Sequence, residues 1–247
     1  MNPRTLLVTA LLLLPTVVGC QTSSMTPGEL SAVQPVSSQP RVGNAYLMRG
    51  WIGVFSTGID SLTEQLNEAG VRAHIYQNSQ YRDLGATIRD TYAGLDNHEP
   101  IILIGHSYGA DDMIRIAKIA AEKNVEIDLL ITLDPVTPPN IPPNVKRAVN
   151  LYQPNGAWDI LPVLRGVAVK PREGMPENVV ENWNLRGNRK DILAEAEGKV
   201  DHFNIEKKAV VHDAIKELVL EYCPPRMYSP QLVSFESPDN PKAGGGE

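Results

Sequence analysis

The sequence predicts a three-layer α/β protein, in which helices cover both faces of a mostly parallel sheet of about six strands. Between residues 45 and 221, short apolar runs alternate with amphipathic stretches, a pattern typical of strand–helix units joined by right-handed crossovers. The runs at residues 101–104 and 129–133 are almost entirely apolar, as in strands buried on both faces. No long insertion separates the expected strands, so we expect no large cap over the sheet.

The apolar runs and amphipathic stretches place each element in turn. Strands are expected at residues 45–49, 71–76, 101–104, 127–133, 147–152 and 179–185. Helices are expected where apolar residues recur at three- and four-residue spacing, at residues 59–69, 80–95, 108–123 and 205–222.

The composition bounds the class of protein. The chain of 247 residues is 42% hydrophobic and 21% charged, which is ordinary for a globular protein with one full core. Its net charge of −6, without a run of Lys and Arg, argues against nucleic acid as a partner. No group of Cys and His has the spacing of a zinc site, and we expect neither a metal nor a cofactor.

The first residues have the features of a secretory signal peptide. Arg4 precedes an apolar run at residues 6–19, which is shorter than the roughly 20 residues that a membrane-spanning helix needs. Small residues lead directly into Cys20, and the run "VVGC" resembles the lipobox of bacterial lipoproteins. The resemblance implies that residues 1–19 are removed, that Cys20 carries lipid, and that Gln21, in place of Asp, favours the outer membrane of the cell envelope. An ordinary signal peptide followed by a coincidental cysteine is the alternative.

The remainder of the chain divides into three parts. Residues 20–44 are rich in Ser, Thr, Gln and Pro without periodicity, which predicts a flexible tether. Residues 45–223 form the expected domain, and residues 224–247 a tail rich in Pro and Gly. A lipid on Cys20 leaves Cys223 without a partner, and a disulfide between them is the less favoured alternative.

The stretch "IILIGHSYGADD" at residues 101–112 predicts a nucleophile elbow. Such an elbow needs a strand, an abrupt turn at the serine with small flanking residues, and a helix that begins at once. Ser107 lies between Gly105 and Gly109, after an apolar run and before an amphipathic stretch. The alternative is a serine that only caps the helix.

A serine nucleophile needs a base and an orienting acid, which follow it in the order Ser…Asp/Glu…His in this kind of fold. His202 precedes the last expected helix and is the favoured base, whereas His212 lies inside that helix. Asp134 directly follows a buried strand and is the favoured acid, because ligands bind at the carboxyl edge of a parallel sheet. Asp159, after the next strand, is the alternative acid.

An oxyanion hole needs two backbone N–H groups aimed at the developing negative charge. The first is expected from Tyr108, which follows the nucleophile, and the second from Trp51 in the loop after the first strand. Gly50 allows the backbone of that loop to approach closely.

The motifs "GHSYG", "TLDPV" and "DHFNI" resemble those of the α/β-hydrolase superfamily, in particular its small lipase-like and esterase-like members and related bacterial lipoproteins. The resemblance covers residues 45–222 and departs at Arg49-Gly50, where many relatives have His-Gly. It implies a serine hydrolase that cleaves small carboxylic or acyl esters through an acyl-enzyme intermediate. A thioesterase or acyltransferase with the same triad, or a non-catalytic envelope lipoprotein that uses the fold for binding, are the alternatives.

Overall fold

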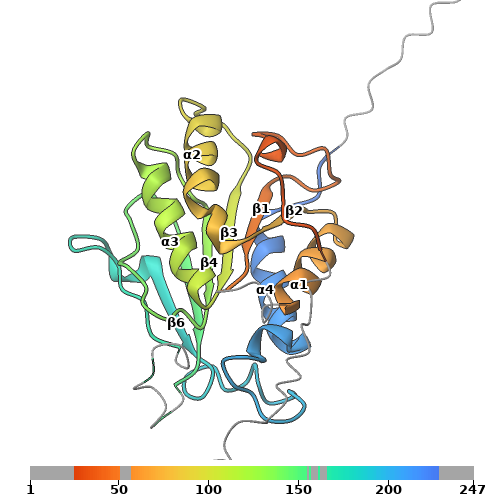
Figure 1. Ribbon diagram of the computed structural model, residues 1–247, viewed down its shortest axis with the longest axis vertical. Coiled ribbons are helices and arrows are strands. Elements are labelled where there is room, and N and C mark those ends of the chain that lie inside the picture. The colour runs from red at the N-terminus through yellow and green to blue at the C-terminus, as the bar shows by residue number, and fades with distance from the viewer. Residues whose placement is uncertain (1–24, 51–56, 155, 157–160, 162–165, 228–247) are drawn as a thin grey trace, which may run out of the picture.

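The computed structural model describes residues 25–50, 57–154, 156, 161 and 166–227, and its centre is a sheet of six parallel strands (Figure 1). The order across the sheet is β2-β1-β3-β4-β5-β6, and every neighbouring pair is parallel. The strands are β1 (Asn44–Met48), β2 (Arg72–Tyr76), β3 (Ile101–His106), β4 (Leu129–Leu133), β5 (Ala148–Tyr152) and β6 (Val180–Asn184).

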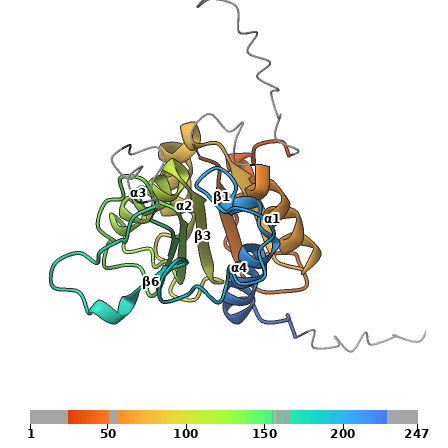
Figure 2. The same ribbon diagram turned by 90° about the horizontal axis from the view of Figure 1, so that it is seen from below.

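In the described part of the chain, four α-helices cover the two faces of the sheet (Figure 2). Helices α1 (Thr57–Glu68) and α4 (Ala209–Tyr222) pack on one face, and α2 (Tyr81–Tyr92) and α3 (Tyr108–Ala121) pack on the other. The predicted fold class is therefore confirmed. The helix expected at residues 205–222 is divided, because the extended backbone of Lys208 separates a 3-10 turn at Ile205–Lys207 from α4.

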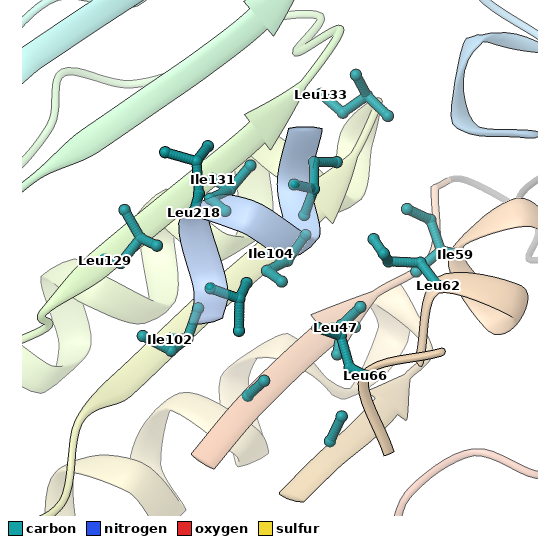
Figure 3. Packing of buried hydrophobic residues seen from close by; sticks show 14 of the residues in the cluster. Leu47, Ile59, Leu62, Leu66, Ile102, Ile104, Leu129, Ile131, Leu133 and Leu218 are labelled. Carbon is teal, nitrogen blue, oxygen red and sulfur yellow. The ribbon is translucent and has the colours of Figure 1, made fainter. Parts of the chain in front are cut away.

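Alternate residues of each strand supply the two cores, as the period of two in a strand requires. Leu47, Ile104 and Ile131 face α1 and α4, whereas their chain neighbours Tyr46, Leu103 and Leu130 face α2 and α3. Figure 3 shows Leu218 of α4 over β3 and β4, and leucines of α1 beside Leu47. Because both faces are covered, loops at the ends of the strands are where the sheet can meet a ligand.

The segment before β1 packs on the domain. The backbone N–H of Gly28 donates to the carbonyl of Ile75, and the guanidinium of Arg72 donates to the carbonyl of Ala32. Val33 is buried in the core that includes α2. The prediction of a flexible tether is therefore wrong for residues 25–44, because side chains of the domain bind the backbone of this segment; residues 20–24 lie outside the described part.

The beginning of the expected C-terminal tail is also bound to the domain. Arg41 forms a β-bridge with Pro225, and the guanidinium of Arg226 lies 2.7 Å from a carboxylate oxygen of Glu99. Cys223 is a buried free thiol, and burial raises its pKa to about 12.

Several predictions concern residues outside the described part of the chain, namely the signal peptide at residues 1–19, Cys20, and the tail from residue 228. Among the described residues, no helix has the length and apolar character to cross a membrane. Within the same ranges, no group of three or more His, Cys, Asp or Glu side chains is placed to hold a metal ion.

Candidate active site

Ser107 occupies a sharp turn between β3 and α3. Its backbone has φ 57° and ψ −128°, a conformation that residues other than glycine rarely adopt. A Cβ on Gly105 would overlap the carbonyl of Gly109, and a Cβ on Gly109 would overlap the carbonyl of Arg49. Both glycines of the predicted elbow are therefore required by the close approach of strand, turn and helix.

The side chain of Ser107 contacts a histidine and does not cap the helix. Its hydroxyl makes no capping hydrogen bond to α3, although Ser107 stands at the N-cap position. The Oγ atom instead lies 2.9 Å from Nε2 of His202. The alternative in which Ser107 serves only as a helix cap does not fit this geometry.

His202 links Ser107 to Asp134. Its Nδ1 lies 3.3 Å from Oδ2 of Asp134, whose other oxygen accepts the backbone N–H of Gln153 at 2.8 Å. Because a carboxylate only accepts hydrogen bonds, Nδ1 of His202 carries the hydrogen. Nε2 is then left to accept the hydroxyl hydrogen of Ser107, which is the arrangement that a general base requires.

The loop that carries Asp134 is held by buried contacts. Asp134 is fully buried with a φ of 47°, and its N–H donates to the carbonyl of Leu151. Burial raises the pKa of Asp134, while the hydrogen bonds from His202 and Gln153 act against that shift. The carboxylate of Asp111 accepts the backbone N–H groups of the two residues that follow Pro135, at 3.1 and 2.8 Å, and so ties this loop to α3.

The remaining predicted site residues are placed as follows. Tyr108 begins α3, where the helix itself supplies no acceptor for the first backbone N–H groups. Trp51 and the alternative acid Asp159 lie outside the described residues. His212 is remote from the triad, since its Nε2 donates to the carbonyl of Glu206 and its Nδ1 accepts from the amide of Gln65. Burial lowers the pKa of His212.

Arg49, the residue at which the sequence departs from the hydrolase pattern, forms a buried ion pair at the end of β1. Its Nε and Nη2 atoms lie 2.8 and 3.1 Å from the two carboxylate oxygens of Asp60 in the first turn of α1. The two residues are 1% and 0% exposed. The two buried charges compensate each other. The paired contacts with Asp60 hold Arg49 in place directly after β1.

His106, the last residue of β3, contacts the base. Its Nε2 lies 3.1 Å from the backbone carbonyl of His202, and the two ring centroids are 5.2 Å apart. A carbonyl only accepts, so Nε2 of His106 donates. Burial lowers the pKa of His106 to about 3, which keeps the ring neutral. The last residue of β3 therefore positions the loop that carries the base.

We expect His106→Phe to lower the rate at which Ser107 is labelled by a fluorophosphonate by about 10²-fold, because a small displacement of the base has that effect on a preorganised site. His106→Gln, which keeps a donor at the same distance from the backbone, should recover most of the loss. The rate of labelling and its dependence on pH are measured for each variant, and thermal unfolding reports folding. Equal impairment of the two variants would show that the contact only fills space.

Three side chains therefore meet at the carboxyl edge of one parallel sheet: a serine at a strained turn after β3, an aspartate after β4 and a histidine before the last helix. Their order along the chain is Ser, Asp, His. This combination of elbow, triad order and parallel sheet resembles the α/β-hydrolase fold.

Comparison with known proteins adds structural neighbours of low similarity. No protein-family profile matches the chain, and no curated protein matches it significantly. Among solved structures, the NocB thioesterase domain of the nocardicin cluster is 17% identical with a TM-score of 0.42, over 72% of this chain and 93% of that chain. The same domain in covalent complex with a fluorophosphonate nocardicin G analog is 13% identical with a TM-score of 0.42, over 72% and 94% of the two chains. A protein from Xanthomonas campestris, described as a "putative hydrolase of the alpha/beta superfamily", is 12% identical with a TM-score of 0.36, over 71% of this chain and 99% of that chain. The candidate site consequently rests on the geometry of this chain.

Proposed function

We propose that this protein is a serine hydrolase of carboxylic esters, with Ser107 as nucleophile, His202 as base and Asp134 as orienting acid. The observation that carries the proposal is the 2.9 Å contact between Ser107 Oγ and His202 Nε2, at a serine whose backbone is held in the strained elbow conformation. A serine that only supports the fold has no need of this backbone strain or of a histidine aligned by a buried carboxylate.

The geometry supports a reaction in two steps. Ser107 Oγ attacks the ester carbonyl carbon while its proton passes to Nε2 of His202, and the tetrahedral intermediate expels the alcohol, which takes that proton. Water then gives a proton to His202 and attacks the acyl-serine, and Ser107 recovers the proton as the carboxylic acid leaves. The backbone N–H of Tyr108, at the start of α3, is our choice for one oxyanion donor, and that of Trp51 for the other.

We further propose that the enzyme is attached to the bacterial envelope, in the outer membrane, through a lipid on Cys20. The support is the sequence alone: a short apolar run followed by small residues that lead into the cysteine. The mass of the mature chain, compared with that of the Cys20→Ala variant, tests this attachment directly.

The proposed activity is tested with a fluorophosphonate probe and with p-nitrophenyl esters of graded chain length. We expect one covalent adduct on Ser107, none on Ser107→Ala, and ester hydrolysis only by the wild type. Parallel thioester substrates and alcohol acceptors separate an esterase from a thioesterase and an acyltransferase. If neither protein hydrolyses the esters faster than buffer alone, and thermal unfolding shows that both are folded, a non-catalytic lipoprotein is favoured; equal hydrolysis above that background would remove Ser107 as the nucleophile.

A further inference from the structure

We call the carboxyl ends of the strands, where Ser107 lies, the catalytic edge, and the amino ends the opposite edge. The segment before β1 runs beside the outer strand β2, from the catalytic edge to the opposite edge. Gly28 binds the carbonyl of Ile75, near the carboxyl end of the edge strand β2 (Figure 1). Ser37 and Gly43 donate their backbone N–H groups to Glu99, just before the start of β3. The segment therefore enters β1 at the opposite edge, and its own beginning lies at the catalytic edge.

Met25 fixes that beginning beside the active site. Its backbone N–H lies 3.2 Å from Oδ2 of Asp60, and its carbonyl accepts Nη2 of Arg49 at 2.6 Å. Arg49 follows β1, and its carbonyl abuts Gly109 of the nucleophile elbow. The chain thus reaches the folded domain next to the elbow, through a buried ion pair.

The C-terminal end of the described chain lies at the opposite edge. Arg226 donates from its backbone N–H to the carbonyl of Pro40, and its guanidinium binds Glu99. Of the two ends of the described chain, only the one at Met25 adjoins the catalytic edge.

The distance from the proposed anchor to the catalytic edge is short. Five peptide units join Cys20 to Met25, and five units span at most about 17 Å when fully extended. A free tether as far as Asn44 would have had 24 units and a reach of about 80 Å, from the opposite edge of the sheet. Because residues 25–44 pack on the domain, the linker to Cys20 is shorter than a free tether would be. It also joins the domain at the catalytic edge and not at the opposite edge.

We infer that the catalytic edge faces the membrane that holds the lipid, and that the substrate is an ester embedded in that membrane by its acyl chain. This inference rests on the proposed lipidation of Cys20 and on the proposed hydrolysis by Ser107. The side chain of Phe203, beside the base, is 48% exposed and presents an apolar surface at this edge. An acyl ester in a bilayer is the ester that the catalytic edge meets at the highest local concentration, because at most about 17 Å of chain joins Met25 at that edge to the lipid on Cys20.

The orientation is tested by fluorescence quenching on vesicles that carry the lipidated full-length protein. A dye is placed on Phe203→Cys at the catalytic edge or on Leu95→Cys, which lies between α2 and β3 at the opposite edge. The buried, high-pKa thiol of Cys223 resists labelling. With a quencher on the headgroups of phosphatidylcholine vesicles, we expect the dye at position 203 to be quenched several-fold more than the dye at position 95. Equal quenching, or a mature chain whose mass shows no lipid, would overturn the inference.

The substrate class is tested by a spacer of twenty Gly and Ser residues between Ser24 and Met25. Because effective concentration falls as about the −3/2 power of linker length, hydrolysis of a long-chain ester in the same vesicles should fall about tenfold. Hydrolysis of a soluble acetate ester should be unchanged, since the insertion leaves the folded residues as they are. An unchanged rate on the vesicle ester overturns the inference, whereas failure of the proposed function appears separately as absence of the fluorophosphonate adduct on Ser107.

Discussion

Asp134→Asn is expected to lower kcat/KM for ester hydrolysis about 10⁴-fold without unfolding the protein. The amide oxygen of asparagine can still accept the N–H of Gln153, but its NH₂ group would face Nδ1 of His202. Nδ1 then becomes the acceptor and the hydrogen moves to Nε2, so that His202 can no longer take the proton of Ser107. Loss of the correct tautomer costs about 10⁴-fold in serine proteases with the same triad. Steady-state kinetics on p-nitrophenyl butyrate measures the loss, and circular dichroism with thermal unfolding checks the fold.

Asp159→Asn is the matched control, because Asp159 is the other carboxylate that the sequence offers as the acid. We expect its kcat/KM to stay within about threefold of the wild-type value, since the described contacts of His202 Nδ1 lead to Asp134. If Asp159→Asn lost the activity and Asp134→Asn kept it, the assignment of the acid would be wrong. The two variants therefore decide between the alternatives on one substrate.

The nucleophile elbow could be predicted because its signal is contiguous. The apolar run, the two glycines around Ser107 and the amphipathic stretch are neighbours in the sequence, and each obeys a local rule. Asp134 and His202 could be predicted for another reason. The carboxyl ends of parallel strands meet at one edge of the sheet, so residues that follow different strands lie close together even when they are far apart in the sequence.

Contacts between distant backbone and side-chain atoms could not be predicted in the same way. The donation from His106 to the carbonyl of His202 depends on how two loops close, and no residue spacing encodes it. The segment at residues 25–44 has the composition of a tether, yet Arg72 and Glu99 bind its backbone groups from distant parts of the chain. Composition predicted correctly that these residues form no long helix or strand, but it does not determine whether such a segment packs.

Glu206 is a buried carboxyl group that the proposed mechanism does not use. It is 0% exposed in the folded protein. The backbone of Gly58 at the start of α1 lies so close that a Cβ there would overlap Glu206. Burial raises the pKa of Glu206 from 4.5 to about 8; Asp60 adds to the shift, while Lys207 and the backbone N–H of Gly58 act against it.

This shift makes the protein less stable as the pH rises. Between pH 4.5 and about 8 the unfolded chain has lost the proton of Glu206 while the folded chain still holds it. The unfolded state then binds fewer protons, so the free energy of unfolding falls with increasing pH across this window and levels off above the folded pKa. At 1.36 kcal/mol for each unit, the full shift corresponds to about 5 kcal/mol, of which about 4 kcal/mol is lost by pH 8, where the folded group is half ionised.

Glu206→Gln should remove this dependence, because the amide does not ionise in either state. We expect the free energy of unfolding of the variant, minus that of the wild type, to rise by about 4 kcal/mol between pH 4 and pH 8. Urea unfolding across this range measures the difference. The packing cost of the buried amide is the same at every pH, so it shifts the whole curve and leaves its slope unchanged.

Glu195→Gln, which makes the same replacement at an exposed glutamate, is the matched control measured over the same pH range. A flat difference for Glu206→Gln would mean that the carboxyl group is solvated in the folded protein. A rising difference, by contrast, requires a neutral carboxyl group packed against the first turn of α1, the helix whose Asp60 holds Arg49 beside the elbow. The same titration would then place a negative charge next to that ion pair above about pH 8. Stability and the buried ion pair of Arg49 and Asp60 are thus coupled through one ionisation.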